Sequence, residues 1–333
     1  MNMTRILSRD HIADIIRMPD VMEAVRTALT ERPDRQAPPF QSLISREERG
    51  RVYIVKSSSG FSMIPGTAGV SVTVSGQETS SSGKNIYNSS VILLFDLESG
   101  ELKAILDGRE ITLLRAAASC AIGARLLANK DEKNMLLVGA GGLATAMLKG
   151  SVESLPGLKQ VSVTSRDNRR TESFINSQSP RYPHLRFVDL SFFDLEDHIG
   201  ENHYLVTASS SGSPLIKKEW VSPGTHITAA GANSPGRQEL DPGIITSSSV
   251  FADDADQASR IGECRTAVET GLISPKNITA IGEVIEGKAA GRTESRQVTV
   301  YDMTGTSLEE TLVAELALRR STYRNTGYIT GII

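Results

Sequence analysis

The sequence predicts an α/β protein in which a Rossmann-type doubly wound parallel sheet is joined to a second, mixed α+β domain. An apolar run at residues 135–138 leads directly into a glycine-rich turn at 139–144, as in the first strand and helix of a dinucleotide-binding unit. Short apolar segments then alternate with helical or loop stretches as far as residue 252, which is typical of a parallel sheet flanked by helices. The 333 residues are enough for two hydrophobic cores.

The composition is that of a globular protein and argues against several classes. Hydrophobic residues make up 39% and charged residues 23% of the chain, and the net charge of −3 gives no basis for a nucleic-acid or anionic-membrane partner. No run reaches the roughly 18 apolar residues of a membrane span, and no signal peptide is evident. Cys120 and Cys264 are too few for a disulfide framework and lack metal-ligand spacing. We therefore expect a cytoplasmic protein without a metal site.

The elements before residue 115 indicate a mixed β domain with flanking helices. Residues 22–29 have the apolar spacing of a helix, whereas residues 31–50, rich in Pro, Arg and Glu, are interpreted as irregular. The predicted strands of this domain cover residues 5–7, 52–55, 68–74, 91–95 and 102–106.

An alanine-rich amphipathic helix at residues 115–128 leads into the predicted parallel sheet. A last helix, at 308–323, must bury an apolar face and is assigned to the first domain. The predicted domains are therefore residues 1–115 with 308–333, and residues 116–307. The strands of the parallel sheet are expected at residues 135–138, 161–164, 186–188, 204–207, 226–229 and 249–252.

The turn at 139–144 carries the small residues that a pyrophosphate site requires. Gly139 makes the tight turn, Gly141 lets the backbone approach a pyrophosphate, and Ala144 lets the helix pack closely on the strand. The N–H groups at the start of the helix then face the phosphates. Taken alone, the turn also fits a plain strand–turn–helix. The candidate cofactor contacts are Gly139, Ala140, Gly141, Gly142, Leu143 and Ala144.

Five stretches resemble, in their order and spacing, the ornithine cyclodeaminase/mu-crystallin family over nearly the whole chain. Each motif is modest by itself, whereas the combination is specific. The stretches are DGREITLLRAAA at 107–118, the glycine turn at 139–144, TASSSGSP at 207–214, the segment from PGTH to ELD at 223–241, and the segment from GEVIEG to TVY at 282–301.

The resemblance implies a homodimer. In the family, the first domain and the last helix build the dimer contact and part of the substrate pocket, and the second domain is a Rossmann-type sheet. The resemblance also implies an NAD(P)-dependent enzyme that oxidises an amino acid at its Cα–N bond or reduces the matching imine. The family includes ornithine cyclodeaminases, alanine dehydrogenases and ketimine reductases.

Arg115 matches the family arginine that binds the substrate carboxylate. A guanidinium pairs bidentately with a carboxylate and stays charged at any working pH, which agrees with this role. We assign Arg115 to the catalytic site and Thr112, in the same motif, to the cofactor site. The alternative for Arg115 is a surface arginine on a helix.

The end of the strand at 161–164 bears on the choice of cofactor. No acidic residue ends this strand, where an NAD-preferring enzyme binds the ribose hydroxyls. Ser165 and Arg166 can instead hold a 2′-phosphate, which favours NADP(H); NAD(H) is the alternative because Asp167 follows. Three small residues at the carboxyl end of the fourth strand are further candidate cofactor contacts: Thr207, Ala208 and Ser209.

Two departures from the family pattern argue against ornithine cyclisation. Asn233 stands where ornithine cyclodeaminases hold an acid/base aspartate, and an amide only donates and accepts hydrogen bonds. We assign it to orienting the substrate nitrogen or the nicotinamide amide, with a turn asparagine as the alternative. A family lysine is also missing from the strand at 69–73, as is an arginine near Pro39 and Phe40, and Lys56 is the candidate replacement for the lysine.

The predicted activity is NADP(H)-dependent reduction of a small cyclic ketimine or α-imino acid, or the reverse amino-acid dehydrogenation. Arg115 holds the carboxylate and Asn233 orients the nitrogen. A redox-neutral cyclodeaminase and a non-catalytic, crystallin-like NADPH-binding protein are the alternatives. We interpret His226 as a hydrogen-bonded structural residue and Glu263 as a helix-capping or packing residue.

Overall fold

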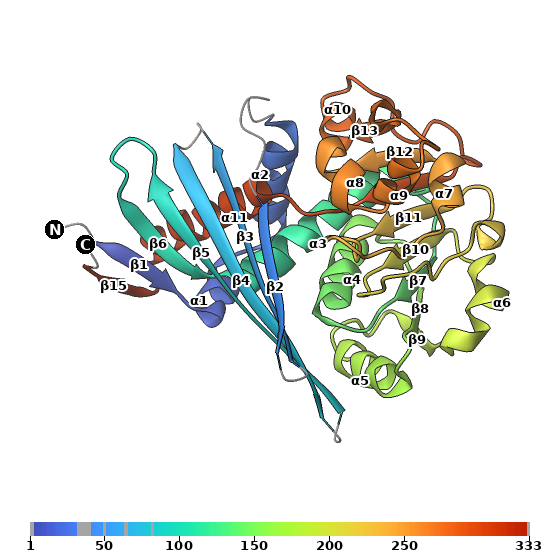
Figure 1. Ribbon diagram of the computed structural model, residues 1–333, viewed down its shortest axis with the longest axis horizontal. Helices are drawn as coiled ribbons and strands as arrows, with labels where there is room; N and C mark the ends of the chain where they lie inside the picture. The colour runs from blue at the N-terminus through green and yellow to red at the C-terminus, as the bar shows by residue number, and fades with distance from the viewer. Residues whose placement is uncertain (1–2, 32–40, 49–50, 63–65, 81–82, 332–333) are drawn as a thin grey trace. The chain divides into compact units, whose positions relative to one another are not determined.

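The computed structural model of the protein describes residues 3–31, 41–48, 51–62, 66–80 and 83–331, with side chains at all of these except residues 41–58 and 77–88 (Figure 1). The chain forms two compact units. Unit 1 contains Met1–Arg115 and Thr306–Ile333, and unit 2 contains Ala116–Gly305. Within the described ranges, no helix is both long and apolar enough to cross a membrane.

Unit 1 is built on one seven-stranded sheet with the order β15-β1-β6-β5-β4-β3-β2. The pair β1–β6 is parallel, and the other neighbours are antiparallel. The strands are β1 (Thr4–Leu7), β2 (Gln41–Glu48), β3 (Arg51–Ser62), β4 (Thr67–Ser80), β5 (Gly83–Asp96), β6 (Leu102–Asp107) and β15 (Tyr328–Thr330).

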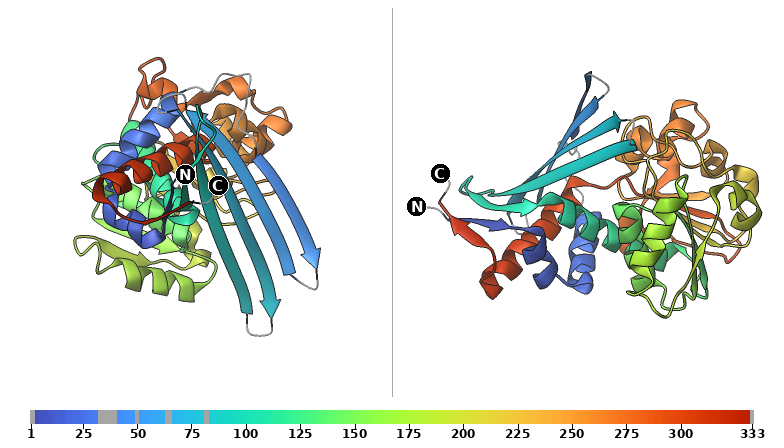
Figure 2. Two further views of the ribbon diagram at one scale, coloured as in Figure 1. Left: turned by 90° about the vertical axis from the view of Figure 1, so that its left-hand side faces the viewer. Right: turned by 90° about the horizontal axis from the view of Figure 1, so that it is seen from below.

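Helices α1 (Arg9–Ile15), α2 (Met18–Thr30) and α11 (Ser307–Arg324) lie on one face of this sheet (Figure 2). Helix α11 packs against β3, β4 and β5. A glycine is needed where it comes closest to β4, because a Cβ at Gly69 would overlap the Thr311 side chain. Leu94 is the register partner of Gly69 and is fully buried on the same face. Its neighbours Leu93 and Phe95 point to the opposite face, since side chains alternate along a strand.

Unit 2 is built on an eight-stranded, wholly parallel sheet with the order β13-β12-β14-β11-β10-β7-β8-β9. The chain runs from β7 through β8 to β9 on one side and then returns to β10 and β11 on the other side. The strand order therefore reverses between β7 and β10, which is the switch point where doubly wound folds bind dinucleotides. The strands are β7 (Asn134–Val138), β8 (Gln160–Thr164), β9 (Arg186–Asp189), β10 (Tyr204–Thr207), β11 (His226–Ala229), β12 (Ser249–Ala252), β13 (Ile278–Ala280) and β14 (Thr299–Asp302).

The core of unit 2 lies along this sheet. Leu136, Leu205, Ile227 and Val300 are fully buried, as expected for strands that are covered on both faces. Helix α3 (Gly108–Leu127) begins in unit 1 and ends in unit 2. The other helices of unit 2 are α4 (Gly142–Ser154), α5 (Asn168–Gln178), α6 (Leu195–Ile199), α7 (Pro242–Thr246), α8 (Ala255–Ile261), α9 (Cys264–Glu269) and α10 (Ile281–Ile285), with short 3-10 turns η1 (Phe192–Asp194), η2 (Lys218–Trp220) and η3 (Pro275–Asn277).

The structure corrects the predicted elements in three places. All six strands predicted for the parallel sheet are present, but β13 and β14 add two that are only 3 and 4 residues long. The interpretation of residues 31–50 as irregular is wrong at Gln41–Glu48, where β2 pairs with β3. The helix predicted at 115–128 already begins at Gly108, because Asp107 Oδ1 accepts a hydrogen bond from the Glu110 N–H at 2.8 Å.

Candidate active site

The glycine turn of unit 2 has a backbone that only glycine adopts readily. Gly139 follows β7 with φ +132°, and its N–H donates to the Thr164 carbonyl at 2.8 Å. A Cβ on Gly139 would lie 2.6 Å from the Ala208 carbonyl oxygen. The turn is thus pressed against the residue that follows β10, which is why the first position must be glycine.

The second glycine leaves room for a ligand at the start of α4. Gly141 is the N-cap of this helix, and a Cβ there would meet no atom within 4 Å. Ala144, one turn on, is fully buried. The three small residues therefore have the two functions that a dinucleotide site requires. Gly139 and Ala144 permit close packing, and Gly141 permits a pyrophosphate to approach the helix N-terminus.

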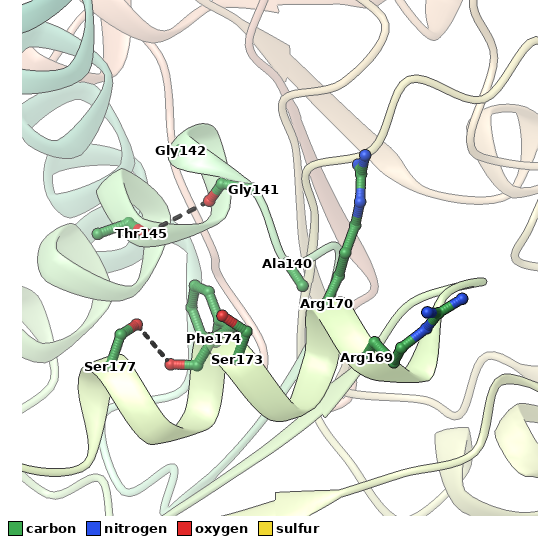
Figure 3. Close-up of a pocket in the computed structure, with 9 residues that line it drawn as sticks. All are labelled: Ala140, Gly141, Gly142, Thr145, Arg169, Arg170, Ser173, Phe174 and Ser177. Carbon is green, nitrogen blue, oxygen red and sulfur yellow. Dashed lines mark hydrogen bonds between the residues drawn. The ribbon is translucent and has the colours of Figure 1, made fainter. Parts of the chain in front are cut away.

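A pocket of about 390 Å³ adjoins this turn. Figure 3 shows the glycine turn together with α5, whose first residues carry the side chains of Arg169 and Arg170. The lining residues are Ala140, Gly141, Gly142, Thr145, Arg169, Arg170, Ser173, Phe174 and Ser177. Peptide N–H groups and two guanidinium groups are the donors that phosphate oxygens bind, so the residues present fit a phosphorylated dinucleotide.

The residues after β8 form hydrogen bonds with one another. Asp167 caps α5 by accepting from the Arg169 N–H at 3.1 Å, and it lies 3.7 Å from the Arg170 guanidinium. Ser165 Oγ donates to the Asp167 carbonyl at 2.9 Å. The Asp167 carboxylate therefore serves the helix, although it is the acidic residue nearest to the place where NAD-preferring enzymes bind the ribose.

Arg166 extends from the end of β8 to the segment after β10. Its Nη2 donates to Ser211 Oγ at 3.0 Å, and its guanidinium lies 5.9 Å from the centre of the Phe192 ring. These two contacts place the guanidinium of this exposed arginine beside the segment after β10. The sequence did not indicate either partner, because both are distant from Arg166 along the chain.

The segments after β10 and β11 are tied together by a buried carboxylate that the sequence analysis did not assign. Glu239 is fully buried; its Oε1 accepts from the Ser209 N–H at 2.7 Å, and its Oε2 accepts from the Gly231 N–H at 2.8 Å. Ala208 N–H donates to the Val138 carbonyl at 2.9 Å, which attaches the same segment to the glycine turn. The predicted contacts Thr207, Ala208 and Ser209 thus lie next to Gly139 at the carboxyl edge of the sheet.

Asn233 is held by its own loop. Its Oδ1 accepts from Arg237 Nη1 at 3.2 Å, and its Nδ2 lies 3.5 Å from the Ala230 carbonyl oxygen. Arg237 also donates to the Gly231 carbonyl at 3.3 Å, and burial lowers the pKa of its guanidinium. These contacts include the local bonds expected of a turn asparagine, so a role for Asn233 toward the substrate remains a prediction.

Glu263 supports the segment that carries Glu239. It accepts from the Glu239 N–H at 2.8 Å, the Leu240 N–H at 2.9 Å and Gln238 Nε2 at 2.7 Å. Burial, and then the charges of Glu239 and Asp302, raise its pKa well above the usual range. Of the two predicted roles, capping is not observed, because the Glu263 side chain makes no capping bond to α9, whereas its complete burial fits the packing role.

His226 is a structural residue, as predicted. Its Nδ1 lies 2.9 Å from Thr299 Oγ1 and its Nε2 lies 3.1 Å from Thr228 Oγ1. Burial, with the charge of Arg292 second, lowers its pKa to about 3, so the ring is neutral in the folded protein.

In unit 1, Arg115 lies beside the start of α11. Its side chain is only 12% exposed; Nη2 is 3.5 Å from Glu310 Oε1 and Nη1 is 3.9 Å from Glu309 Oε2. Thr112 Oγ1 donates to the same Glu310 oxygen at 2.9 Å. The alternative of a surface arginine therefore does not hold for Arg115, and its two acidic neighbours, almost 200 residues away along the chain, could not be predicted from local sequence.

Two further predictions concern side chains that the structure does not describe. Lys56 is in β3 opposite Thr73, but its side chain is not among those described. The segment near Pro39 and Phe40 also lies outside the described residues. Among the described residues, no group of three His, Cys, Asp or Glu side chains is arranged to hold a metal ion.

The sequence from residue 2 to residue 322 matches the profile of the ornithine cyclodeaminase/mu-crystallin family. The chain belongs to this family. The resemblance inferred from the five motifs is thereby confirmed over nearly the whole chain.

Relatives within the family include enzymes of amino-acid and imino-acid chemistry. The chain is 29% identical over 329 residues to an alanine dehydrogenase of Archaeoglobus fulgidus, with 97% of each protein covered. It is 30% identical over 247 residues to an iminosuccinate reductase of Paracoccus denitrificans, with 72% of each covered. The solved structure of an archaeal alanine dehydrogenase dimer with bound NAD matches the whole of both chains with 26% identity and a TM-score of 0.85, which confirms the predicted fold class.

Proposed function

We propose that the protein is a nicotinamide-dependent oxidoreductase of C–N bonds. It reduces a small cyclic ketimine or α-imino acid, or runs the reverse amino-acid dehydrogenation. The observation that carries the proposal is the glycine turn, with Gly139 packed against Ala208 and open space at Gly141. The alanine dehydrogenase and the iminosuccinate reductase among the relatives support this reaction class.

In this proposal unit 2 binds the dinucleotide, and unit 1 contributes Arg115 to the binding of the substrate. The bound nicotinamide supplies the hydride for reduction, or accepts it in the reverse direction. Gly141 and the first N–H groups of α4 hold the pyrophosphate, and the segment Thr207–Ala208–Ser209 adjoins the nicotinamide half. Arg115 binds the substrate carboxylate through its guanidinium. Asn233 orients the substrate nitrogen by hydrogen bonding, because an amide does not transfer the proton itself.

We further propose that NADP(H) is preferred over NAD(H). The support is that the Asp167 carboxylate is already in use, because Oδ1 caps α5 and Oδ2 lies 3.7 Å from the Arg170 guanidinium. Arg166, which contacts Ser211 and Phe192, supplies a guanidinium for a 2′-phosphate. Thr112 is also proposed as a cofactor contact, although its hydroxyl donates to Glu310 in this structure.

We also propose a homodimer whose interface includes the face of the unit 1 sheet opposite α11. Val70 pairs in register with Leu93, and Leu93 pairs with Ile105, on the face opposite α11. These side chains and Val72 and Phe95 are only partly buried, and such an apolar strip is typical of a subunit interface. The solved alanine dehydrogenase structure is described as a dimer, which supports a second copy as the occupant.

The dimer is tested by light scattering during gel filtration of the wild type and of Leu93→Lys. The wild type is expected to elute at twice the 35.9 kDa of the chain, and Leu93→Lys at the monomer mass, because a buried lysine is costly. Leu97→Lys, at an exposed turn position, is the matched control and remains dimeric. A wild type that is monomeric at micromolar concentration contradicts the proposal.

The activity is tested by following nicotinamide absorbance with a panel of cyclic imines, and of keto acids combined with amines, using NADPH and NADH in parallel. Turnover with an imine establishes the reductase. Conversion of a diamino acid without net change of the cofactor would identify a cyclodeaminase instead. Tight NADPH binding with no turnover on any imine would identify a binding protein.

A further inference from the structure

Two loops at the carboxyl edge of the unit 2 sheet converge on one buried side chain. The loop after β10 contributes the Ser209 N–H and the loop after β11 contributes the Gly231 N–H, and the two oxygens of Glu239 accept one each, at 2.7 Å and 2.8 Å. The loops touch closely, because a Cβ on Gly231 would overlap both the Ser209 carbonyl and the Glu239 carboxylate. One carboxylate thus fixes the distance between these loops.

A second set of hydrogen bonds, around Glu263 and Gln238, holds the segment that carries Glu239. Glu263 accepts from the backbone N–H groups of Glu239 and Leu240, and from the side chain of Gln238. Gln238 is fixed in turn by Thr266 Oγ1, which donates to its Oε1 at 2.6 Å. These hydrogen bonds connect α9 and the residue before it to the segment that carries Glu239, and so brace the two loops.

We propose that Glu239 is a positioning residue for the nicotinamide half of the cofactor. Ala208 and Ser209 lie beside the glycine turn through the bond from Ala208 N–H to Val138, and the loop after β11 continues to Asn233. In a doubly wound sheet the adenosine half lies over the strands on one side of the switch point, here β8 and β9, and the nicotinamide half over those on the other side, β10 and β11. Glu239 braces only the loops that follow β10 and β11. This inference rests on the proposed use of a nicotinamide dinucleotide.

The protonation of the Glu239 carboxylate affects how it holds the two loops. Burial raises the pKa of Glu239, and the donors Ser209, Thr207 and Gly231 lower it. The substitution Glu239→Gln replaces one carboxylate oxygen, a hydrogen-bond acceptor, by an NH₂ group, which is a donor. This NH₂ group then faces the backbone N–H of Ser209 or of Gly231, which is also a donor, and the hydrogen bond is lost. One loop then loses its anchor while the other keeps it.

The test separates the two halves of the cofactor. Binding of NADPH and of 2′-phospho-ADP-ribose, which lacks nicotinamide, is measured by calorimetry for the full-length wild type and Glu239→Gln. We expect the Kd for NADPH to rise roughly tenfold or more, as for loss of one charge-assisted hydrogen bond. The Kd for the fragment is expected to rise less than the Kd for NADPH, since, in the described part of the chain, the adenosine side reaches the loop after β10 only through the bond of Arg166 to Ser211 and the packing of Gly139 on Ala208.

A buried carboxylate in unit 1 gives the matched control. Glu315 accepts from Thr67 Oγ1 at 3.0 Å and from Lys103 Nζ at 3.2 Å, so Glu315→Gln also removes a buried acceptor. It is expected to leave both Kd values unchanged. Equal weakening of both probes by Glu239→Gln, or weakening of neither, overturns the positioning role. A wild type that binds neither probe refutes the proposed function, and the inference falls with it.

A second measurement uses the wild type alone and covers the case in which Glu239→Gln does not fold. Amide hydrogen exchange is followed in peptides that contain Ser209 and Gly231. Both amides are expected to be protected in the free protein, because both are bonded to the same buried carboxylate. Rapid exchange at either amide would contradict the brace.

Discussion

Glu310 Oε1 lies 3.5 Å from Arg115 Nη2, so the arginine assigned to the substrate carboxylate already faces a carboxylate of its own chain. Glu309 is the second acidic neighbour, 3.9 Å from Nη1. Both glutamates stand in the first turn of α11, where the helix dipole stabilises negative charge. A substrate carboxylate that binds Arg115 must therefore compete with Glu310 for the guanidinium.

Removing that competitor should strengthen substrate binding. For Glu310→Gln we expect the KM of a carboxylate-bearing imine to fall several-fold, on the order of 1 kcal/mol for a partly buried ion pair. The KM of the matching imine without a carboxylate should not change. Steady-state kinetics with the two imines checks this, with Glu110→Gln, which breaks the pair of Glu110 with Arg9, as control. A rise in KM would mean instead that Glu310 orients Arg115 for the substrate.

Alanine substitutions of the first two glycines of the turn should have different effects, on stability at Gly139 and on dinucleotide binding at Gly141. Gly139→Ala places a Cβ 2.6 Å from the Ala208 carbonyl at φ +132°, so we expect a loss of stability of roughly 1–3 kcal/mol. Gly141→Ala meets no protein atom and should keep its melting temperature, but it should bind the dinucleotide at least about tenfold more weakly because the methyl group occupies the approach to the pyrophosphate. Thermal melting and calorimetry separate the two effects. Equal melting temperatures with equal Kd values would refute the cofactor assignment of the turn.

The sequence indicates those parts of the fold and site that depend on local pattern. The turn at 139–144 is recognisable because a tight turn, a phosphate approach and a close helix contact each restrict a single position to a small residue. The strands of the parallel sheet are recognisable because buried strands need continuous apolar runs. The strand β2 is not, since its sequence QSLISREE has too little alternation to distinguish it from a polar loop.

The polar contacts of the site depend on tertiary structure and leave no such pattern. Thr112 and Glu310 are 198 residues apart, and the bond between them follows from the return of α11 to unit 1. Glu239 stands within a motif that carries the family resemblance, yet nothing in its neighbours indicates that it accepts from Ser209, 30 residues away. Sequence spacing predicts which side chains share an element, whereas these bonds join separate elements.

Cofactor preference should depend on Arg166. In Arg166→Asp, the guanidinium held by Ser211 and Phe192 is replaced by a carboxylate, which repels a 2′-phosphate and accepts from ribose hydroxyls. The ratio of kcat/KM for NADPH to that for NADH should fall by about a hundredfold, or roughly 3 kcal/mol. Arg181→Asp, at an exposed position after α5, is the control for the charge change. An unchanged ratio in Arg166→Asp would remove Arg166 from the 2′-phosphate site.

Asp302 makes the stability of unit 2 depend on pH. It ends β14 and is fully buried, and burial raises the pKa of its carboxyl from 3.8 to about 7, although the Cys264 N–H donates to Oδ2 at 3.0 Å. Between these two values the unfolded chain has released the proton while the folded chain retains it. The Asp302 contribution to the free energy of unfolding therefore falls as pH rises through this window and is constant on either side.

Asp302→Asn removes this titration, because the amide is neutral at every pH. The free energy of unfolding of the variant relative to the wild type should therefore increase between about pH 4 and pH 7, by at most about 4 kcal/mol for a shift of some three pKa units. Urea unfolding of both proteins across this range measures the difference. His226→Asn should show the opposite dependence, since the neutral buried ring, with its pKa of about 3, makes the wild type lose stability as pH falls below about 6.5. A difference between Asp302→Asn and the wild type that is constant with pH would mean that Asp302 is ionised in the folded protein throughout.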